Sequence, residues 1–451
     1  MKSRASGSAK VSLTKPSGPT PIERVARPFQ EFSESEAAGG VLLLSATVLA
    51  LAWANSPWSE SYSQLWEHKF TIGFEGFALS KSILHWINDG LMAVFFFVVG
   101  LEIKRELLVG ELASPRQAAL PIAGALGGVV VPALLYFSLN AGGPGAAGWG
   151  IPMATDIAFA VGAMALLGSR VPVGLKVFLT ALAIVDDIVA VLVIAIFYTG
   201  NLSWPSLGVV GGFFAALLAA SILGVRNPLT YVLLGFCMWV AMLLSGVHAT
   251  IAGVLAALAV PAQPRIDVEK FIARGRRLLD QMEYPDDGEE HILRSEARQA
   301  AVMALEDTCE KVETPLQRFE HTLLPWVRLI IMPLFALANA GVALGTSTTA
   351  ATSPVSLGIV LGLVVGKPIG IFGASWLAVR LGLASLPAQV GWRQILGVGV
   401  LGGIGFTMSI FIAGLAFAGQ PLLEIAKLGI FAASLIAGGT GFLLLFKFGR
   451  A

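Results

Sequence analysis

Charged residues are scarce in this 451-residue chain, at 13% of the composition, whereas about a quarter is usual for a soluble globular protein. The 30 basic and 29 acidic residues nearly balance, and the basic ones are spread over short connections, which argues against a nucleic-acid partner. Cysteine is also scarce. Cys237 lies in an apolar run and Cys309 in a charged one, which argues against a disulfide and against structural zinc. We expect no bound cofactor.

Hydrophobic residues make up 55% of the chain instead. A membrane-spanning helix needs about 20 mostly apolar residues, and about twelve such segments can be placed along the sequence. We therefore predict an all-α integral membrane protein with about twelve transmembrane helices, embedded in the lipid bilayer. Because almost the first forty residues are polar, the first segment does not fit a cleaved signal peptide. The segments begin near Gly40, Ile83, Gln117, Ile151, Leu175, Ser206, Leu229, Gly246 (a short one), Leu324, Ser356, Leu396 and Leu423.

Basic residues in the short connections predict the orientation of the chain. The connections Asn140 to Gly150, Tyr198 to Ser206 and Gly345 to Ser353 carry no charge. The alternate connections carry the positive charges, so we predict a multi-pass membrane protein with both termini in the cytoplasm. The basic residues concerned are Lys104, Arg105, Arg116, Arg170, Lys176, Arg226, Arg380 and Arg393.

Residues 262–316 differ in kind, because they are strongly charged. Helical patterns around Val268 to Met282 and Glu289 to Lys311, separated by Tyr284 to Gly288, predict a cytoplasmic helical hairpin. Its simplest role is that of a solvated insert, and a regulatory contact surface is the alternative. The chain then divides into a disordered basic tail (1–38), helices one to eight (39–261), the insert (262–316) and helices nine to twelve (317–451).

Two apolar runs are interrupted by Pro, Gly and hydroxyl residues, at Pro152 to Asp156 and at Gly402 to Ser409. Such interruptions free backbone polar groups, which hydrocarbon tolerates only where the chain lines an enclosed cavity. The runs lie within two three-segment groups, beginning near Gln117 and Ser356, that have opposite orientation. Paired broken helices in inverted repeats indicate the binding site of a transporter.

An ionised side chain at the bilayer centre costs about 2.5 to 3.5 kcal/mol, so Asp156, Asp186, Asp187 and Lys367 are functional candidates. Consecutive helical residues are about 100° apart, so Asp186 and Asp187 can face different neighbours. Sodium prefers oxygen ligands, which carboxylates, Thr155 and freed carbonyls supply. The same carboxylates bind protons. Competition between the two ions at one site, open to each side in turn, is sufficient for antiport.

Other interpretations of these acids exist. The ion pairs could serve only to fix helix packing. A symporter of a small organic solute could use a similar inverted-repeat fold. An intramembrane aspartyl protease is disfavoured because the acids are adjacent or accompanied by a lysine and no Gly-x-Gly-Asp segment occurs. A passive cation channel is disfavoured because the buried Lys367 would oppose a file of cations.

A second group of charges, Glu102, Arg105 and Glu106, has i, i+3 and i+4 spacing and so shares one helix face. An interfacial ion pair and a gating role explain this spacing equally well. A lone membrane histidine is more often a hydrogen-bonded packing residue than a functional one. Weaker candidates are therefore His248 and the pair Glu320 and His321.

The chain resembles the NhaA sodium/proton antiporters from about Phe32 to its end, apart from the charged insert. The resemblance implies an electrogenic antiporter of the bacterial inner membrane that exports Na⁺, and Li⁺ as well, in exchange for external protons and so regulates internal pH and sodium. It leaves open whether the chain forms a homodimer. Seven segments in the same order carry the resemblance: Leu101-Glu-Ile-Lys-Arg-Glu106, Ala154-Thr-Asp-Ile-Ala-Phe159, Val185-Asp-Asp187, Ser245-Gly-Val-His-Ala-Thr250, Phe335-Ala-Leu-Ala-Asn-Ala-Gly341, Gly366-Lys-Pro368 and Gly403-Ile-Gly-Phe-Thr-Met-Ser-Ile410.

This resemblance also implies residue roles. Asp187 would be the direct sodium ligand and Asp186 the partner of Lys367. Asp156 and Thr155 would lie where two broken helices cross, with Asp156 and Lys367 balancing the helix-end dipoles. The family's cytoplasmic pH-sensing entrance would map onto Glu102, Arg105, Glu106, His248, Glu320 and His321.

Two departures from the family affect the pH range of activation. Leu324 stands where members can carry a histidine before the Pro-Trp of the ninth helix. The insert at 262–316 lengthens the loop beside the entrance.

Overall fold

The computed structural model describes residues 36–74, 77–200, 202–264, 266–283, 295–343 and 352–449. Among these residues, eight helices are long and apolar enough to cross a membrane, or ten when each of two bent helix pairs counts as one span. Two further apolar helices, α10 (Pro228–Leu243) and α11 (Ile251–Ala259), are shorter. The helical membrane architecture thus agrees with the prediction, including the short segment expected near Gly246. The predicted N-terminal tail lies almost wholly outside the described residues.

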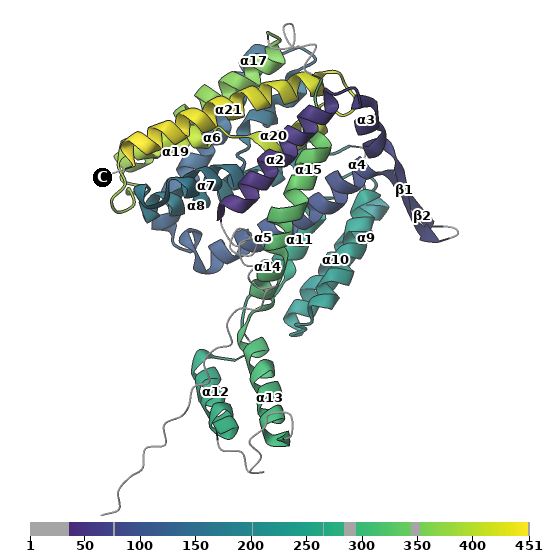
Figure 1. Ribbon diagram of the computed structural model, residues 1–451, viewed down its shortest axis with the longest axis vertical. Coiled ribbons are helices and arrows are strands. Elements are labelled where there is room, and N and C mark those ends of the chain that lie inside the picture. Colours follow the sequence, from purple (N-terminus) through teal and green to yellow (C-terminus); the bar gives the residue numbers. More distant parts are fainter. Residues whose placement is uncertain are drawn as a thin grey trace, which may run out of the picture.

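The helices follow the predicted segments in chain order (Figure 1). The first half contains α2 (Glu36–Ala54), α3 (Ser59–Glu67), α4 (Ile83–His85), η1 (Trp86–Leu91), α5 (Met92–Val109), η2 (Glu111–Ala113), α6 (Pro115–Asn140), η3 (Ala146–Met153), α7 (Ile157–Leu166), η4 (Gly168–Arg170), α8 (Val173–Phe197) and α9 (Trp204–Ile222). After α10 and α11, the second half contains α12 (Val268–Glu283), α13 (Glu296–Val312), α14 (Pro315–Trp326), η5 (Val327–Ile331), α15 (Met332–Asn339), α17 (Pro354–Leu361), η7 (Gly362–Gly366), α18 (Lys367–Arg380), α19 (Trp392–Leu401), α20 (Phe406–Ala416) and α21 (Leu422–Phe448).

Proline marks several helix starts, because its fixed φ suits the first turn and its missing N–H is not needed there. Helices α6, α9, α10 and α17 each carry proline at the first or second position. The Asn227 side chain accepts a hydrogen bond from Leu229 N at the start of α10, and Ser353 accepts one from Ser356 N at the start of α17. Such caps satisfy backbone donors that the helix itself leaves free.

A close backbone contact joins α6 to α18. A Cβ atom on Gly127 would lie 2.1 Å from the carbonyl oxygen of Gly370, and one on Gly370 would lie 2.0 Å from that of Gly127. Only glycine at both positions allows the two backbones to approach this closely, a common device in membrane helix packing. Lys367 lies one turn before Gly370, so this contact fixes where its side chain begins.

The chain between α3 and α4 forms an antiparallel β-hairpin of β1 (Lys69–Phe74) and β2 (Phe77–Ser82). The all-helical prediction did not include it. The indole nitrogen of Trp86 donates a hydrogen bond to the carbonyl of Phe70 at 3.0 Å, which ties the hairpin to the next helix. In Figure 1 the hairpin projects at the right of the helix bundle, whereas α12 and α13 project at the bottom.

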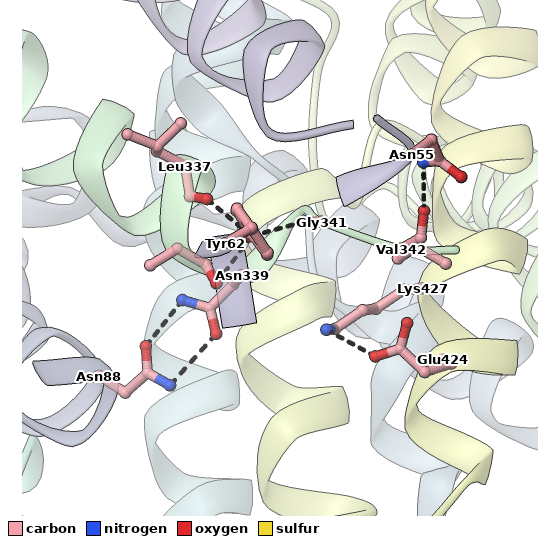
Figure 2. A network of polar contacts seen from close by, with 10 residues as sticks. Asn55, Tyr62, Asn88, Leu337, Asn339, Gly341, Val342, Glu424 and Lys427 are labelled. Carbon is pink, nitrogen blue, oxygen red and sulfur yellow. Dashed lines mark hydrogen bonds and ion pairs between the residues drawn. The ribbon is translucent and has the colours of Figure 1, made fainter. Parts of the chain in front are cut away.

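A polar network holds α3 against the end of α15 (Figure 2). The Tyr62 hydroxyl donates to the Leu337 carbonyl at 2.8 Å and accepts from Gly341 N at 3.0 Å. The side-chain amides of Asn88 and Asn339 exchange hydrogen bonds at 3.2 and 2.8 Å. The bonds of Tyr62 satisfy backbone groups where α15 ends, and the paired amides join η1 to the last residue of α15.

The charged insert is closed at its base by a hydrogen bond from Leu316 N to the Pro261 carbonyl at 3.2 Å. Helices α12 and α13 lie side by side beyond this base, with Arg298 donating to the Met282 carbonyl at 3.0 Å. The connection predicted at Tyr284 to Gly288 lies outside the described residues.

Replacing Gly370 with Ala should force α6 and α18 apart and lower the free energy of unfolding by about 1 to 3 kcal/mol, the usual cost of overpacking. Thermal unfolding of the purified protein in detergent measures this. The control is Gly373→Ala on the same helix, where an added Cβ meets no atom within 4 Å. Equal melting temperatures for the two variants would contradict the close contact.

Candidate ion-binding site

The breaks in two helices meet at one point in the bundle. One break covers residues 154–156, between η3 and α7, and the other separates α19 from α20, which are bent by 47°. Asp156 N donates to the Ile404 carbonyl at 2.7 Å, and Ser409 Oγ donates to the Ile151 carbonyl at 2.8 Å. Each break therefore satisfies polar groups that the other leaves free, which makes irregular backbone tolerable within an apolar bundle.

Asp156 faces the beginnings of two helices at once. Its Oδ1 accepts a hydrogen bond from Phe159 N at 3.2 Å, which caps α7. Its Oδ2 accepts from Thr407 N at 3.0 Å, at the start of α20, and also from the Thr407 hydroxyl. Since helix N-termini carry partial positive charge, this buried carboxylate is stabilised by both of them. The placement is the one that the family resemblance implies for Asp156.

Lys367 and Asp186 form an ion pair, with 2.6 Å between Nζ and Oδ2 and both side chains buried. The ammonium also donates to the carbonyl of Met153, the last residue of η3, so it lies where that helix presents partial negative charge. Thr155 Oγ1 lies 2.7 Å from the same Asp186 oxygen and 3.0 Å from the Gly402 carbonyl. The other oxygen of Asp186, Oδ1, is buried and has no hydrogen-bond partner among the described residues.

Asp187 is buried like Asp186 but faces a different neighbourhood, as the angle between consecutive helical residues allows. It lines a cavity of about 260 Å³ together with Asp156 and Glu102. Within the part of the chain that the structure describes, its carboxylate has neither an ion-pair nor a hydrogen-bond partner. One acid of the pair is thus neutralised by Lys367, and the other faces open space.

This cavity offers oxygen ligands among mostly apolar walls. Asp187 and Asp156 contribute carboxylates, and Val98, Met332 and Met408 are among the apolar lining residues. Such a site suits a hard monovalent cation that keeps part of its water, because sodium prefers oxygen ligands. Among the described residues, no three or more His, Cys, Asp and Glu side chains are grouped so that they could hold a metal ion.

The entrance cluster, which we define as Glu102, Arg105, Glu106 and Glu320, joins α5 to α14. Arg105 pairs with the buried Glu320, and its other terminal nitrogen lies 3.5 Å from Glu106. Glu102 lies one turn from Arg105 and also lines the cavity that contains Asp187. The cluster and the candidate ion site are therefore connected through one cavity. His321, beside Glu320, is exposed.

His248 does not join this cluster, contrary to the map that the resemblance implied. Its ring packs on Phe411, with 6.0 Å between ring centroids. Helix α11, which begins three residues after His248, contacts the start of α5, because a Cβ atom on Gly253 would lie 2.1 Å from the Ala93 carbonyl oxygen. Ala93 precedes Arg105 by 12 residues of helix, or about 18 Å at 1.5 Å per residue, so the structure places His248 toward the opposite end of α5.

Sequence reasoning missed three contributors to the site. Thr407 binds Asp156 through both its amide and its hydroxyl, and the carbonyls of Met153 and Gly402 accept hydrogen bonds from Lys367 and Thr155. The run from Gly402 to Ser409 was identified as a break from its glycines, but the pattern did not distinguish Thr407 from the other polar residues within it.

Comparison with known proteins finds a match to the family described as Na⁺/H⁺ antiporter 1 over residues 30–445. A protein of Oleidesulfovibrio alaskensis named Na(+)/H(+) antiporter NhaA is 54% identical over 428 residues, which is 95% of each chain. Na(+)/H(+) antiporter NhaA 2 of Syntrophotalea carbinolica is 52% identical, over 95% of this chain and 98% of its own. Na(+)/H(+) antiporter NhaA of Koribacter versatilis is 50% identical, over 95% and 93%.

Removing Lys367 should strand the Asp186 carboxylate in an apolar site, at a cost of about 3 to 5 kcal/mol. Asp186→Asn combined with Lys367→Ala should then cost less than the sum of the two single changes, because the second substitution removes the stranded charge. Melting temperatures in detergent at one pH measure the coupling.

Lys427 provides a matched control for this cycle. It pairs with Glu424 at 3.0 Å, but the Glu424 side chain is 49% exposed, so breaking that pair should cost at most about 1 kcal/mol. Strictly additive shifts for Lys367 and Asp186 would show that they do not interact.

Proposed function

This chain belongs to the Na⁺/H⁺ antiporter 1 family, and from that membership we propose that it exports Na⁺ in exchange for external protons, with Asp187 as the group that binds either ion. The family predicted from the sequence motifs is confirmed. The chain is a transporter, and the names of its relatives support antiport rather than symport of an organic solute.

One observation carries the assignment to Asp187: of the two adjacent buried acids, only Asp186 is paired with Lys367, whereas Asp187 lines the cavity without a partner. An unpaired carboxylate in an apolar cavity gains a counter-charge by binding either a proton or a sodium ion. The two ions exclude one another at that oxygen pair. When the site opens first to one side of the membrane and then to the other, it releases one ion on each side and binds the other in its place.

The breaks in the two helices explain how such a site can change its exposure. Hydrogen bonds across the breaks, from Asp156 N to Ile404 and from Ser409 to Ile151, hold the two irregular segments together as a unit. Rocking of such a unit against the rest of the bundle is the usual form of alternating access in inverted-repeat transporters.

Exchange moves net charge in this proposal. Asp187 carries one proton, and the Asp186–Lys367 pair can take up a second one when the pair separates, so more than one proton can be released for each sodium ion bound. The transport cycle is therefore electrogenic and responds to the membrane potential. Lithium, with the same charge and the same preference for oxygen, is a second substrate.

We further propose that the chain lies in the bacterial inner membrane with both termini in the cytoplasm, which the basic residues in alternate connections support. The entrance cluster then lies on the cytoplasmic side of the cavity. Glu102 lines that cavity and lies one turn from Arg105, which pairs with Glu106 and Glu320, so protonation of these carboxylates would set how readily sodium enters.

Replacing Asp187 with Asn should reduce sodium-dependent proton movement in proteoliposomes at least a hundredfold, because the amide carries neither the charge nor the proton. Melting temperature and insertion should be retained, since this carboxylate has no partner to lose. Asp267→Asn, at an exposed aspartate directly before α12, should retain full exchange. Substantial exchange in the Asp187 variant would refute its role.

Competition also predicts how the apparent KM for sodium depends on pH. The ligand must be deprotonated to bind a cation. Below the pH at which the site becomes protonated, the apparent KM for sodium should therefore rise about tenfold for each unit by which the pH falls if one proton competes, and about a hundredfold if two protons compete. The maximal rate at saturating sodium should change far less. Initial rates measured over sodium concentration at several pH values test this, and a KM that stays constant while the maximal rate falls would exclude simple competition.

A further inference from the structure

The charged insert contains a basic groove, which we define as the hollow lined by Lys270, Arg274, Arg277 and Lys311. Its volume is about 720 Å³, and its walls come from α12 and from the end of α13. The helical repeat explains the arrangement on α12: residues 270, 274 and 277 are spaced i, i+4 and i+7 and share one face. The groove shares no lining residue with the cavity at the candidate ion site, and the proposed exchange mechanism does not use it.

Positive charge in the groove is only partly balanced. Asp307 lies 3.7 Å from Arg274 and also binds Lys311, and Asp267 lies 3.4 Å from Lys270. Four cations thus face two carboxylates, and Arg277 has no carboxylate partner among the described residues. Arginine beside lysine in a concave site is typical of phosphate recognition, because the planar guanidinium matches two phosphate oxygens at once.

Both ends of the insert are tied to the membrane surface, which places the groove near lipid head groups. The span Pro315–Asn339 begins with the polar residues Gln317, Arg318 and Glu320, which favours a position for its first turn outside the hydrocarbon core. Lys311 precedes Pro315 by four residues, so it lies within about 14 Å of that turn. The hydrogen bond from Leu316 to Pro261 holds the other end of the insert at the same level.

We propose that the basic groove binds the phosphate of an anionic phospholipid head group from the leaflet that faces the insert. The groove is much larger than a single phosphate ion needs, and the apolar side chains of Ile266 and Leu278 in its wall suit the glycerol and the first acyl carbons of a lipid. An anionic leaflet attracts basic side chains near it, with an attraction that falls off over a Debye length of about 8 to 10 Å, whereas free phosphate has no such enrichment there.

Native mass spectrometry of the full chain in neutral detergent tests the proposal by counting retained phospholipids. Short-chain phosphatidylglycerol should bind, and phosphatidylcholine with the same acyl chains should not bind at the same concentration. Arg277→Gln should weaken phosphatidylglycerol binding at least fivefold, and Arg274→Gln with Arg277→Gln at least twentyfold. Arg277→Lys, which keeps the charge but not the planar guanidinium, should bind more than Arg277→Gln and less than the unchanged chain, which separates loss of charge from misfolding of the hairpin.

Arg276→Gln is the matched control, because it removes the same charge from the same helix outside the groove. Equal phosphatidylglycerol retention in this control and in the double variant would overturn the proposal. Inorganic phosphate at millimolar concentration should not displace the lipid; if it does so completely, the groove is a site for free phosphate and the lipid assignment is wrong. These measurements record binding, so they can fail or succeed independently of sodium/proton exchange.

Discussion

The ion pair between Lys367 and Asp186 is the interaction on which the rest of the site depends. Two acids side by side on a buried helix would repel each other, and each would lose much of its hydration. Lys367 neutralises one of them at 2.6 Å and is itself held by the Met153 carbonyl at a helix end. This leaves a single uncompensated carboxylate, Asp187, in a cavity where, in the proposed mechanism, either a proton or a sodium ion supplies the missing charge.

The broken helices make that arrangement possible. Continuous helices would have their polar ends at the membrane surfaces. The two breaks instead bring the N-terminal ends of α7 and α20 to Asp156 and the C-terminal end of η3 to Lys367. The charged residues are thereby stabilised by fixed dipoles without additional charges. The close contact of α6 with α18, through Gly127 and Gly370, then sets how deep Lys367 lies relative to the acids on α8.

The charged residues of the site and the two helix breaks could be predicted from the sequence, because a charged or helix-breaking residue is rare within a membrane-spanning segment. Asp156, Asp186, Asp187 and Lys367 stand out against apolar runs, and glycine and proline reveal the two breaks. Other features carry no such contrast. Thr407 is one hydroxyl among several, and the β-hairpin lies in a mixed polar and apolar connection where a short strand has no distinct period. The motif around His248 implied a place in the entrance cluster, but the structure places this side chain toward the opposite end of α5. A sequence motif can suggest a role for a residue without showing where along a helix its side chain lies.

The most direct test of the account measures internal pH in vesicles that contain the purified protein and are acid inside. Adding sodium outside, with no organic solute present, should raise the internal pH, and a potassium ionophore that dissipates the membrane potential should accelerate the rise. Absence of any sodium-driven pH change, or a change that requires an added solute, would contradict the proposed exchange at Asp187.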